Sequence, residues 1–509
     1  MQIPLERDEG EYAYIGQLML QGIPPYLLAY NMKLPGIYAI YTLIMAIFGQ
    51  TITGIHLGLL FFNTAAIVLL FLLVRRLFDD ITSVIAAFVY AMLSLSPTVF
   101  GTSAHATQFI VPFMLASTLL LIKALDSDKY WMVFASGLLY GLTFIIKQHA
   151  IFYIFFAVFY FIAYGLLKIH TERKRLVLGA SILLAASVIP FLISCIMLYT
   201  AGVFSQFWFW TFTYAHQYVS IVPLSEGLHI FMIQSYKVIR PWEWVWVTAG
   251  LGLTGIFWDE KAKSNWIFLT GFSLFSFLTI VPGFYFRKHY FVTLLPVIAL
   301  LAGVAISAMI RLLSARKMPS FVKVLPIIFI VTALIFPTYE LRNFFFKISP
   351  VEACRMMYDG NPFPESIEIA EYIQNHSVKD DKIAILGSEP QICFYANRKS
   401  ATGYIYVYGL MEPQDYAINM QKDMIQEIET TRPKYAVLVD IPYSWLPDKN
   451  SNMLIINWAL TYLKKNYRTV GIFDISRNSY SAFWENNLKQ YKPISSNNIF
   501  VMERIKGLN

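Results

Sequence analysis

The feature that most constrains this 509-residue chain is a series of apolar runs that recurs from about residue 50 to residue 340. Runs of roughly 17–25 apolar residues are long enough to cross the hydrocarbon core of a bilayer as helices. Only 14% of the residues are charged, whereas soluble domains average about 25%. The sequence therefore predicts a polytopic α-helical membrane protein.

The apolar runs predict about ten membrane-spanning helices, and several of these runs are short. The ten expected spans are residues 54–74, 81–97, 109–122, 132–146, 150–167, 176–200, 245–257, 266–282, 290–310 and 324–339. Every second connection between them is basic, beginning with RRLF after the first span and KALDSDKY between the third and fourth. Because cytoplasmic loops carry an excess of Lys and Arg, we expect these connections on the cytoplasmic side and the others outside.

Net charge and cysteine content exclude two other classes. The formal charge of +8 arises from Lys and Arg in short loops between apolar runs, so it does not indicate a nucleic-acid-binding protein. Cys195, Cys354 and Cys393 have no CxxC spacing, which argues against a metal site or a disulfide scaffold. A single bridge between Cys354 and Cys393 is an open alternative.

From about residue 340 the pattern changes to that of a water-soluble domain. Short apolar segments of strand length, KIAIL, KYAVLV, RTVGIFDI and NIFVMERI, are separated by helical patterns such as PESIEIAEYIQNH. Strands that alternate with helices predict a small α/β domain. Because this domain follows the tenth span, we expect it to be extracytoplasmic.

Two other apolar segments have no clear assignment from their composition. Residues 33–49, KLPGIYAIYTLIMAIFG, either span the membrane or lie along its surface, and the second alternative places the N-terminus outside. The aromatic run 207–214 favours an interfacial belt over a sugar-stacking platform.

Polar groups gather at the connections that are predicted to face outward. Lys147 lies between two spans, Arg287 and His289 lie in YFRKHYFVTLLP, and His105 and Gln108 lie in GTSAHATQF. Single basic groups at such places often anchor a helix end at the lipid phosphates. Their accumulation opposite to the usual basic side favours a site for a lipid-linked phosphate, because charge-assisted hydrogen bonds to phosphate are strong at low dielectric.

An acidic pair, Asp8 and Glu9, precedes a helical pattern near the start of the chain. Acidic residues at this place cap a helix and complement its dipole, which suffices to explain the pair taken alone. A positioned carboxylate is also the usual base for a hydroxyl that attacks an acetal carbon. The second interpretation gains support if the pair shares one side of the membrane with the basic groups.

The order of these motifs resembles that of the GT-C superfamily of membrane glycosyltransferases, in particular the branch of protein mannosyltransferases and of the aminoarabinose transferases that modify lipid A. RDEGEYAYIGQLMLQG resembles the first external loop of that family, and KLPGIYAIYTLIMAIFG the Lys-Pro segment that follows. Later family segments are similar to LLFLLVRRLFDD, GLTFIIKQHAIFY, YFRKHYFVTLLP and, in the tail, GSEPQICFYANRKSATGYIYVYG. The resemblance covers nearly the whole chain.

The resemblance implies an enzyme that transfers a hexosyl or pentosyl group from a polyprenyl-phosphate donor to an extracytoplasmic glycan, lipid or protein, with inversion at the anomeric carbon. Asp8 matches the family's base, and Glu9 would assist or orient it. The candidates for binding the donor phosphate are Lys33, Arg287, His289 and Lys147. The candidates for handling the acceptor, or for the role of the second external loop, are His105, Gln108 and Tyr290.

No nucleotide or nucleic-acid partner is implied, because the chain has no Gly-rich phosphate loop and the donor is carried by a lipid. No cofactor is implied either. A divalent cation is compatible with the family, although one carboxylate pair makes a thin site for it. The resemblance places the protein in the plasma (inner) membrane, with the catalytic face and the C-terminal domain outside the cytoplasm.

The chain departs from the family pattern at two places. Relatives often carry another acidic residue in the second external loop, where SAHATQF has Gln108 and no carboxylate. Relatives also begin with a membrane-spanning helix, where this chain has only MQIPLE; we therefore expect the chain to start one helix too late, with an eleventh span lost. The expected organisation is residues 1–53 as an external loop with membrane-surface helices, 54–339 as the transmembrane domain and 340–509 as the α/β domain.

Two rival functions fit parts of the same pattern. A transporter or flippase of lipid-linked saccharides would line a cavity through the helices with charges and often has inverted repeats. In this chain the charges lie on one side only, and no two halves look alike. An O-antigen-polymerase-like enzyme also has external catalytic loops, but the folded tail and the early acidic pair argue against it.

Overall fold

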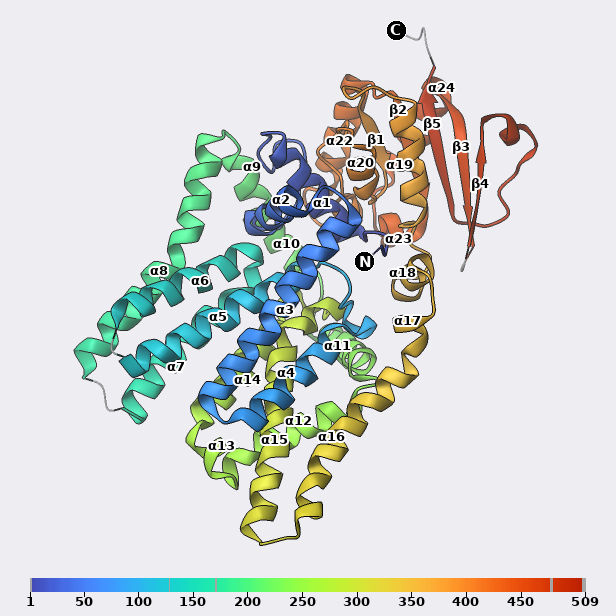
Figure 1. Ribbon diagram of the computed structural model, residues 1–509. Coiled ribbons are helices and arrows are strands. Elements are labelled where there is room, and N and C mark those ends of the chain that lie inside the picture. Colours follow the sequence, from blue (N-terminus) through green and yellow to red (C-terminus); the bar gives the residue numbers. More distant parts are fainter. Residues whose placement is uncertain (1, 128, 170–171, 477–478, 506–509) are drawn as a thin grey trace.

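The computed structural model describes residues 2–127, 129–169, 172–476 and 479–505. Within them the chain forms a helical bundle, followed by a five-stranded sheet with its own helices (Figure 1). The segments long and apolar enough to cross a membrane are α3 (Ile52–Leu77), α5 (Ala106–Ser127), Gln148–Leu167, α8 (Arg173–Thr200), Lys288–Ala315 and α16 (Ser320–Glu340). The chain is a multi-span membrane protein, as the sequence predicts.

All ten predicted spans form helices, but four of these helices are short. They are α4 (Asp80–Ser94), α6 (Tyr130–Ile146), α12 (Glu243–Thr254) and α14 (Trp266–Leu278), with 12 to 17 residues each. An α-helix rises about 1.5 Å per residue, so these four are shorter than the roughly 30 Å of bilayer hydrocarbon. The positions of the predicted helices are confirmed, whereas among the described residues only six segments reach spanning length by themselves.

Burial separates the centre of the bundle from its periphery. The most apolar window of Lys288–Ala315, which contains α15 (Leu295–Ala315), is entirely buried inside the protein, whereas only 28% of the corresponding window of α16 is buried. α15 packs between α4 and α12. It is the central helix, and the helices around it leave apolar faces for lipid.

The basic connections of the bundle lie together at one end. Arg76 pairs with Asp126, and Lys261 and Arg311 both pair with Asp79, so three of these connections and the end of α15 are in contact. α1 (Arg7–Leu20) and α2 (Pro35–Phe48) lie over the opposite end (Figure 1). The alternation predicted from charge is therefore present as two distinct ends of the bundle.

α2 covers most of the ambiguous apolar segment. Its 14 residues would extend about 21 Å, which is too short for a span. It packs beside α1, with one side exposed at Leu43, Ile47 and Phe48. Its place at a membrane surface stays a prediction, as do the domain boundaries.

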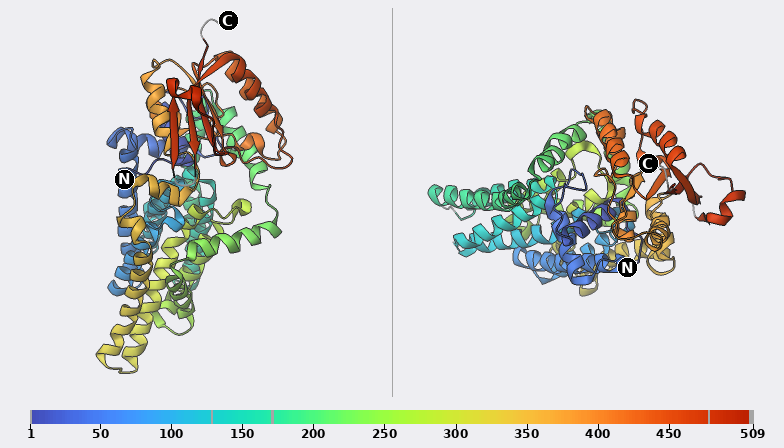
Figure 2. Two further views of the ribbon diagram at one scale, coloured as in Figure 1. Left: turned by 90° about the vertical axis from the view of Figure 1, so that its right-hand side faces the viewer. Right: turned by 90° about the horizontal axis from the view of Figure 1, so that it is seen from above.

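The C-terminal part forms a mixed sheet in the order β1-β2-β5-β3-β4. Its strands are β1 (Ile383–Leu386), β2 (Tyr435–Asp440), β3 (Tyr467–Ile475), β4 (Tyr480–Trp484) and β5 (Asn498–Arg504). β1 and β2 are parallel, and the other pairs are antiparallel. Four strands match the predicted segments and β4 was missed. Figure 2 shows the sheet beyond the end of the bundle that carries α1, with helices packed beside it.

The remaining elements lie within the bundle, connect it to the C-terminal part or flank the sheet. They are α7 (Ile151–Leu167), α9 (Phe204–Trp208), the π-helix Phe209–Tyr214, α10 (Ala215–Val219), α11 (Leu224–Ile239), α13 (Glu260–Ser264), α17 (Arg342–Phe346), α18 (Pro350–Tyr358), α19 (Glu365–Asn375), α20 (Gln391–Ala396), α21 (Tyr408–Met411), α22 (Ala417–Thr431), α23 (Pro442–Trp445), α24 (Leu454–Asn466) and the 3-10 turns Pro97–Val99, Gln148–Ala150, Gly255–Phe257, Pro282–Phe284, Lys288–Leu294 and Glu485–Gln490. Cys195, Cys354 and Cys393 are all free thiols, so the alternative of a Cys354–Cys393 bridge is wrong.

Candidate functional site

A cavity of about 410 Å³ lies where α1, the end of the bundle and the C-terminal domain meet. Segments that are far apart in the sequence supply its walls. Its polar and aromatic lining includes Glu6, Arg7, Asp8, Tyr30, Asn31, Lys33, Phe100, His105, Trp210, Tyr214, Tyr218, Gln234, Lys237, Arg287, Lys288, His289, Tyr290, Tyr358, Asn361, Phe363, Tyr404, Tyr406, Tyr408, Glu412 and Tyr443. Most of the predicted site residues are among them, and the structure brings these together at one place.

The start of α1 separates the two members of the acidic pair. Glu6 and Glu9 form a capping box: the Glu6 side chain accepts from the Glu9 amide at 2.9 Å, and Glu9 accepts from the Glu6 amide at 3.2 Å. Glu9 is only 1% exposed, accepts from the Ala104 amide at 2.6 Å and lies 3.1 Å from His56 Nε2. Glu9 therefore caps and anchors α1, and it does not line the cavity as Asp8 does. Its assisting role stays a prediction.

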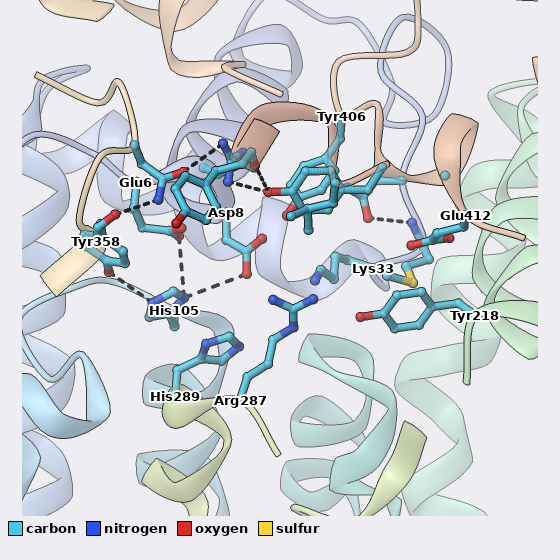
Figure 3. Close-up of a pocket in the computed structure, with 18 of the residues that line it drawn as sticks. Glu6, Asp8, Lys33, His105, Tyr218, Arg287, His289, Tyr358, Tyr406 and Glu412 are labelled. Carbon is cyan, nitrogen blue, oxygen red and sulfur yellow. Dashed lines mark hydrogen bonds and ion pairs between the residues drawn. The ribbon is translucent and has the colours of Figure 1, made fainter. Parts of the chain in front are cut away.

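Asp8 extends into the cavity, and its side chain is 14% exposed. Figure 3 shows Lys33 and Arg287 on one side of its carboxylate and His105 and His289 on the other. Burial acts to raise the pKa of Asp8, but the positive charges led by Lys33 outweigh it and lower this pKa below its usual value. Asp8 is therefore an ionised carboxylate that faces open space.

Lys33, Arg287 and Lys147 form the basic side of the site. The Tyr218 phenol, ahead of the opposing effect of burial, helps to raise the pKa of Arg287 well above its usual value. Burial acts to lower the pKa of Lys33, but Asp8 more than offsets it and raises this pKa. Lys33 and Arg287 are therefore both charged. In the described part of the chain, neither forms an ion pair with a carboxylate within 4.0 Å.

Lys147 lies behind this lining rather than in it. Its side chain is buried, and Nζ lies 4.2 Å from the centre of the Tyr290 ring, which does line the cavity. Burial, and then the charge of Lys33, lower the pKa of Lys147 well below its usual value. Lys147 is therefore a neighbour of the lining residue Tyr290, and its role in binding the donor phosphate stays a prediction.

His105 and His289 stack face to face, with ring centres 4.2 Å apart and planes 10° apart. His105 Nδ1 lies 3.8 Å from Asp8 and 3.5 Å from Glu6. Burial lowers the pKa of His105 to about 4, so its imidazole is neutral at neutral pH. Ligand atoms of Asp8, His105 and His289 all lie within 4.8 Å of one another. Neutral imidazoles and a carboxylate are the forms that bind divalent metals, so these three could hold one.

Gln108, the predicted acceptor-site candidate of the second external loop, does not reach the cavity. Gln108 is buried, donates to the Gly101 carbonyl at 3.4 Å and is not part of the lining. Glu6 supplies a second carboxyl of the site, and its Oε1 lies 3.5 Å from the same His105 nitrogen that Asp8 approaches. Burial, followed by Asp8 and Glu9, raises the pKa of Glu6 well above its usual value. Glu6 was not predicted as a site residue, because a glutamate at the start of a helical pattern is ordinarily explained as a helix cap.

The C-terminal domain supplies a wall that sequence analysis missed. Tyr404, Tyr406 and Tyr408 occur at every second position of GYIYVYG and line the cavity. Glu412 follows them and accepts from the Tyr214 hydroxyl at 2.6 Å, which joins this wall to the π-helix. The alternation of tyrosines was the available signal. Tyr214 and its neighbour Trp210 line the cavity too, so the aromatic run is not simply an interfacial belt.

Comparisons with known proteins agree with this architecture. The sequence profile of the dolichyl-phosphate-mannose-protein mannosyltransferase family matches residues 33–194. No curated protein sequence matches the chain. The profile match includes Lys33, His105 and Lys147 and begins after Asp8.

Solved structures match nearly the whole chain. ArnT from Cupriavidus metallidurans bound to undecaprenyl phosphate has a TM-score of 0.59 at 14% identity, over 99% of this chain and 95% of that one. The archaeal oligosaccharyltransferase AglB from Archaeoglobus fulgidus, in complex with an inhibitory peptide and a dolichol-phosphate, has a TM-score of 0.54 at 13% identity, over 99% and 72%. The same enzyme tethered to an acceptor peptide gives 0.54 at 14%, over 95% and 70%. At these identities the similarity shows the fold.

Proposed function

We propose that this protein, whose fold is that of the GT-C membrane glycosyltransferases as its sequence predicts, is a glycosyltransferase that moves a sugar from a polyprenyl-phosphate donor to an extracytoplasmic acceptor. The observation that carries the proposal is the position of Asp8. It is an ionised carboxylate in a cavity, beside two cations, Lys33 and Arg287, that have no carboxylate within ion-pair distance among the described residues. This combination fits a base next to a phosphate site.

The basic side of the cavity fits the donor. Lys33 and Arg287 offer charge-assisted hydrogen bonds to a phosphate, and the planar guanidinium can bind two of its oxygens. Two similar structures contain lipid phosphates, undecaprenyl phosphate in ArnT and dolichol-phosphate in AglB. A lipid carrier also fits a cavity that lies at one end of a membrane bundle.

The proposed reaction is a single displacement at the anomeric carbon. Asp8 accepts the proton of an acceptor hydroxyl as its oxygen attacks the sugar from the face opposite to the phosphate. The bond between the anomeric carbon and the phosphate oxygen breaks, and its electron pair stays on the phosphate. Lys33 and Arg287 stabilise the charge that develops there, and the anomeric centre is inverted.

The acceptor would contact the wall that the C-terminal domain supplies. Tyr406, Tyr408 and Glu412 lie across the cavity from the bundle and offer ring faces, hydroxyls and a carboxyl. Such groups suit a polar substrate with several hydroxyls. The basic connections gather at the far end of the bundle, so the cavity and the C-terminal domain would face outward from the plasma membrane.

A divalent cation is an optional addition to this scheme. Held by Asp8, His105 and His289, it would supply positive charge beside the donor phosphate. The displacement described above requires none. Transfer that persists in a chelator would support the metal-free scheme, and loss that is restored by one added metal would assign these residues to a metal site.

The test is transfer by the purified chain in liposomes. Labelled polyprenyl-phosphate hexoses and pentoses are offered with candidate acceptors, and the Asp8→Asn variant is compared with the natural chain. Transfer by the natural chain and loss in the variant are expected. Full turnover by Asp8→Asn would remove Asp8 from the mechanism. Movement of a lipid-linked saccharide across the bilayer without transfer would instead identify a transporter.

A further inference from the structure

The residue immediately before the proposed base is a buried cation that reaches away from it, into the C-terminal domain. Arg7 is the first residue of α1 and is 7% exposed. Its Nε donates to the Ser388 carbonyl at 2.5 Å, and Nη1 donates to the Tyr408 hydroxyl at 2.6 Å. Its Nη2 donates to Asn361 at 3.2 Å and pairs with Glu389 at 2.9 Å. The planar guanidinium is thereby fixed from three sides.

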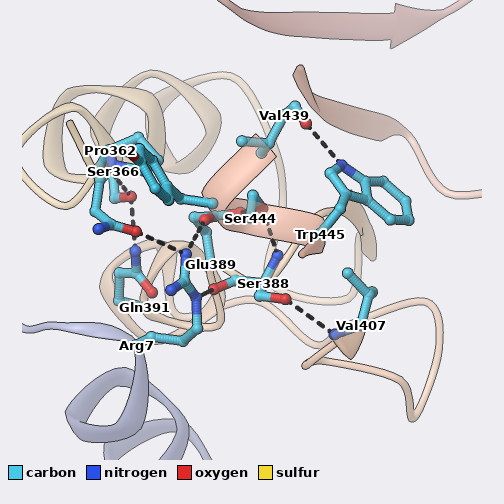
Figure 4. Close-up of polar contacts among 12 residues, drawn as sticks. Arg7, Pro362, Ser366, Ser388, Glu389, Gln391, Val407, Val439, Ser444 and Trp445 are labelled. Atoms are coloured by element: carbon cyan, nitrogen blue, oxygen red, sulfur yellow. Dashed lines mark hydrogen bonds and ion pairs between the residues drawn. The ribbon is translucent and has the colours of Figure 1, made fainter. Parts of the chain in front are cut away.

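Glu389, the ionic partner of Arg7, is itself held by the sheet. It is completely buried, and its second carboxylate oxygen accepts from the Ser444 hydroxyl at 2.6 Å. The Ser388 amide donates to the same hydroxyl at 2.8 Å. Glu389 follows β1, and Ser444 follows β2, so the loops at the carboxyl ends of two parallel strands meet here (Figure 4).

Two glycines allow this junction to close. A Cβ at Gly387 would lie 2.5 Å from the Glu389 carboxylate and 2.7 Å from the Ser444 hydroxyl. A Cβ at Gly10, one turn along α1 from Arg7, would lie 2.7 Å from Cβ of Gln391. A larger side chain at Gly10 would push α1 away from the C-terminal domain, and one at Gly387 would displace Glu389 and Ser444. The junction therefore depends on a close approach of two backbones.

A buried ion pair contributes little net stability, because desolvation of the two charges offsets their attraction. Its better-attested effect is to select one arrangement over others, since each misaligned charge would remain unpaired in the interior. Here the Arg7–Glu389 pair selects one position of the first turn of α1 against the C-terminal domain. Asp8 is the next residue in that turn, so a fixed Arg7 determines where the Asp8 carboxylate points.

We propose that Arg7 and Glu389 form a positioning pair, through which the C-terminal domain holds Asp8 in its place in the cavity. This inference rests on the proposed function and extends it. The C-terminal domain then sets the rate of the chemical step, in addition to forming a wall for the acceptor. Arg7 borders the cavity, but its three guanidinium nitrogens are engaged in these bonds, and Glu389 lies outside the lining, so neither is assigned a contact with the reacting atoms.

The kinetic test replaces Glu389 by its neutral isostere. Glu389→Gln is expected to lower kcat about 10-fold to 100-fold while the donor KM changes less than threefold, because the phosphate site is unaltered. Ser444→Ala loosens Glu389 without removing a charge and is expected to lower kcat severalfold, which keeps the test informative if Glu389→Gln folds poorly. A kcat at the natural level in both variants would overturn the inference.

The matched control is a second buried pair in the C-terminal part of the chain, Arg355 with Glu365. Glu365→Gln also strips a buried arginine of its carboxylate partner. Among the described contacts none joins Arg355 or Glu365 directly to Arg7, and Asn361, which accepts from both arginines, is the link between them. We expect it to reduce thermal stability and to leave kcat of the folded protein unchanged. An equal fall of kcat in Glu365→Gln would show that any loosening of the domain slows transfer, and this too would overturn the inference.

A double variant separates positioning from general damage. If Glu389 acts through Asp8, then kcat of the double variant Asp8→Asn with Glu389→Gln is no lower than kcat of Asp8→Asn alone. If the two substitutions lowered kcat independently, so that their fold-losses multiplied in the double variant, Glu389 would not act through Asp8. If the natural chain transfers sugar but Glu389→Gln retains full kcat, only the positioning role fails and the proposed function stands.

A second measurement does not depend on the reaction. Amide hydrogen exchange in the first turn of α1 is expected to rise at least tenfold in Glu389→Gln and to stay unchanged in Glu365→Gln. Unchanged exchange in both variants would overturn the inference whatever reaction the protein catalyses. If no donor supports transfer by the natural chain, the proposed function fails, and the exchange result still decides whether the pair holds α1.

Discussion

The two ends of the helical bundle carry similar charged residues in opposite arrangements. At the end with the basic connections, Asp79 pairs with Lys261 at 2.8 Å and with Arg311 at 2.9 Å. Arg311 also makes two bonds of 2.8 Å to Asp259. At the cavity end, Lys33 and Arg287 surround Asp8, and in the described residues neither cation lies within ion-pair distance of a carboxylate.

This difference distinguishes charged residues that hold the fold together from charged residues that can bind a ligand. Arg311 joins Asp79, which caps α4, to Asp259, which caps α13, so its partners tie helix ends together. Lys33 and Arg287 border the cavity, and within the described residues neither pairs with a carboxylate that caps a helix. A cation that no carboxylate neutralises is available to bind an anionic ligand. The four predictions below test this contrast, beginning with the largest effect.

The first prediction compares one aspartate at each end. Asp8→Asn is expected to lower the transfer rate about 100-fold to 10,000-fold, because it removes the base. Asp79→Asn makes the same chemical change at the other end and is expected to leave kcat of the folded protein unchanged. Both are measured in liposomes at saturating donor. Equal losses in the two variants would break the contrast.

The second prediction concerns the cations beside Asp8. Arg287→Gln and Lys33→Gln are each expected to raise the KM for the polyprenyl-phosphate sugar about 10-fold to 100-fold, because each removes a charge-assisted bond to the phosphate. Arg287→Lys should recover part of the loss, since the charge is kept but the planar fork is not. An unchanged KM in both Gln variants would place the donor phosphate elsewhere.

The third prediction addresses the structural role of the opposite end. Arg311→Gln is expected to lower the midpoint of thermal unfolding by a few degrees, because Asp79 and Asp259 lose a shared partner. The loss is modest because Arg311 and Asp79 are partly exposed and solvent screens them. Thermal unfolding in detergent and the donor KM are measured together. A donor KM raised as far as in Arg287→Gln would contradict the division of roles.

The fourth prediction uses a buried carboxyl at the cavity end, Glu11, which lies outside the lining and accepts from the Tyr38 hydroxyl at 3.0 Å. Burial raises the pKa of Glu11 to about 8. The folded state therefore holds a proton that the unfolded state releases near pH 4.5, so Glu11 costs stability as the pH rises toward 8. Glu11→Gln, with a neutral isostere, should flatten this fall and unfold at higher temperature than the natural chain at pH 8, but not at pH 4. Parallel pH profiles of thermal unfolding would contradict it.

Much of the fold was predictable from local pattern. Apolar runs located all ten helices of the bundle, and β-rich segments such as KYAVLV located four of the five strands. The lengths of the helices were harder to predict than their positions, because a helix such as α12 can be short when neighbouring helices bury it. β4 was missed since YSAFW is short and only partly buried, which leaves no clear alternation.

The site residues that could be predicted are charged or titratable side chains in segments that the sequence places on the outer side. Asp8, Lys33, Arg287 and His289 were predicted and all line the cavity. The acidic pair could not be resolved in advance, because whether Asp8 or Glu9 turns inward depends on the capping box and on the contact of Glu9 with Ala104. These contacts join distant parts of the chain and leave no local signature.

The wall formed by the tyrosines of the C-terminal domain has a consequence for how such proteins diversify. Tyr408 stands 401 positions after Arg7, so the codons for this wall lie far from those for Asp8 and Lys33. Genetic exchange can therefore replace the tyrosine wall without changing the segments that supply Asp8 and Lys33. Because the Arg7–Glu389 junction must re-form after each exchange, a chimaera that carries a foreign tail should work only if it brings the junction with it.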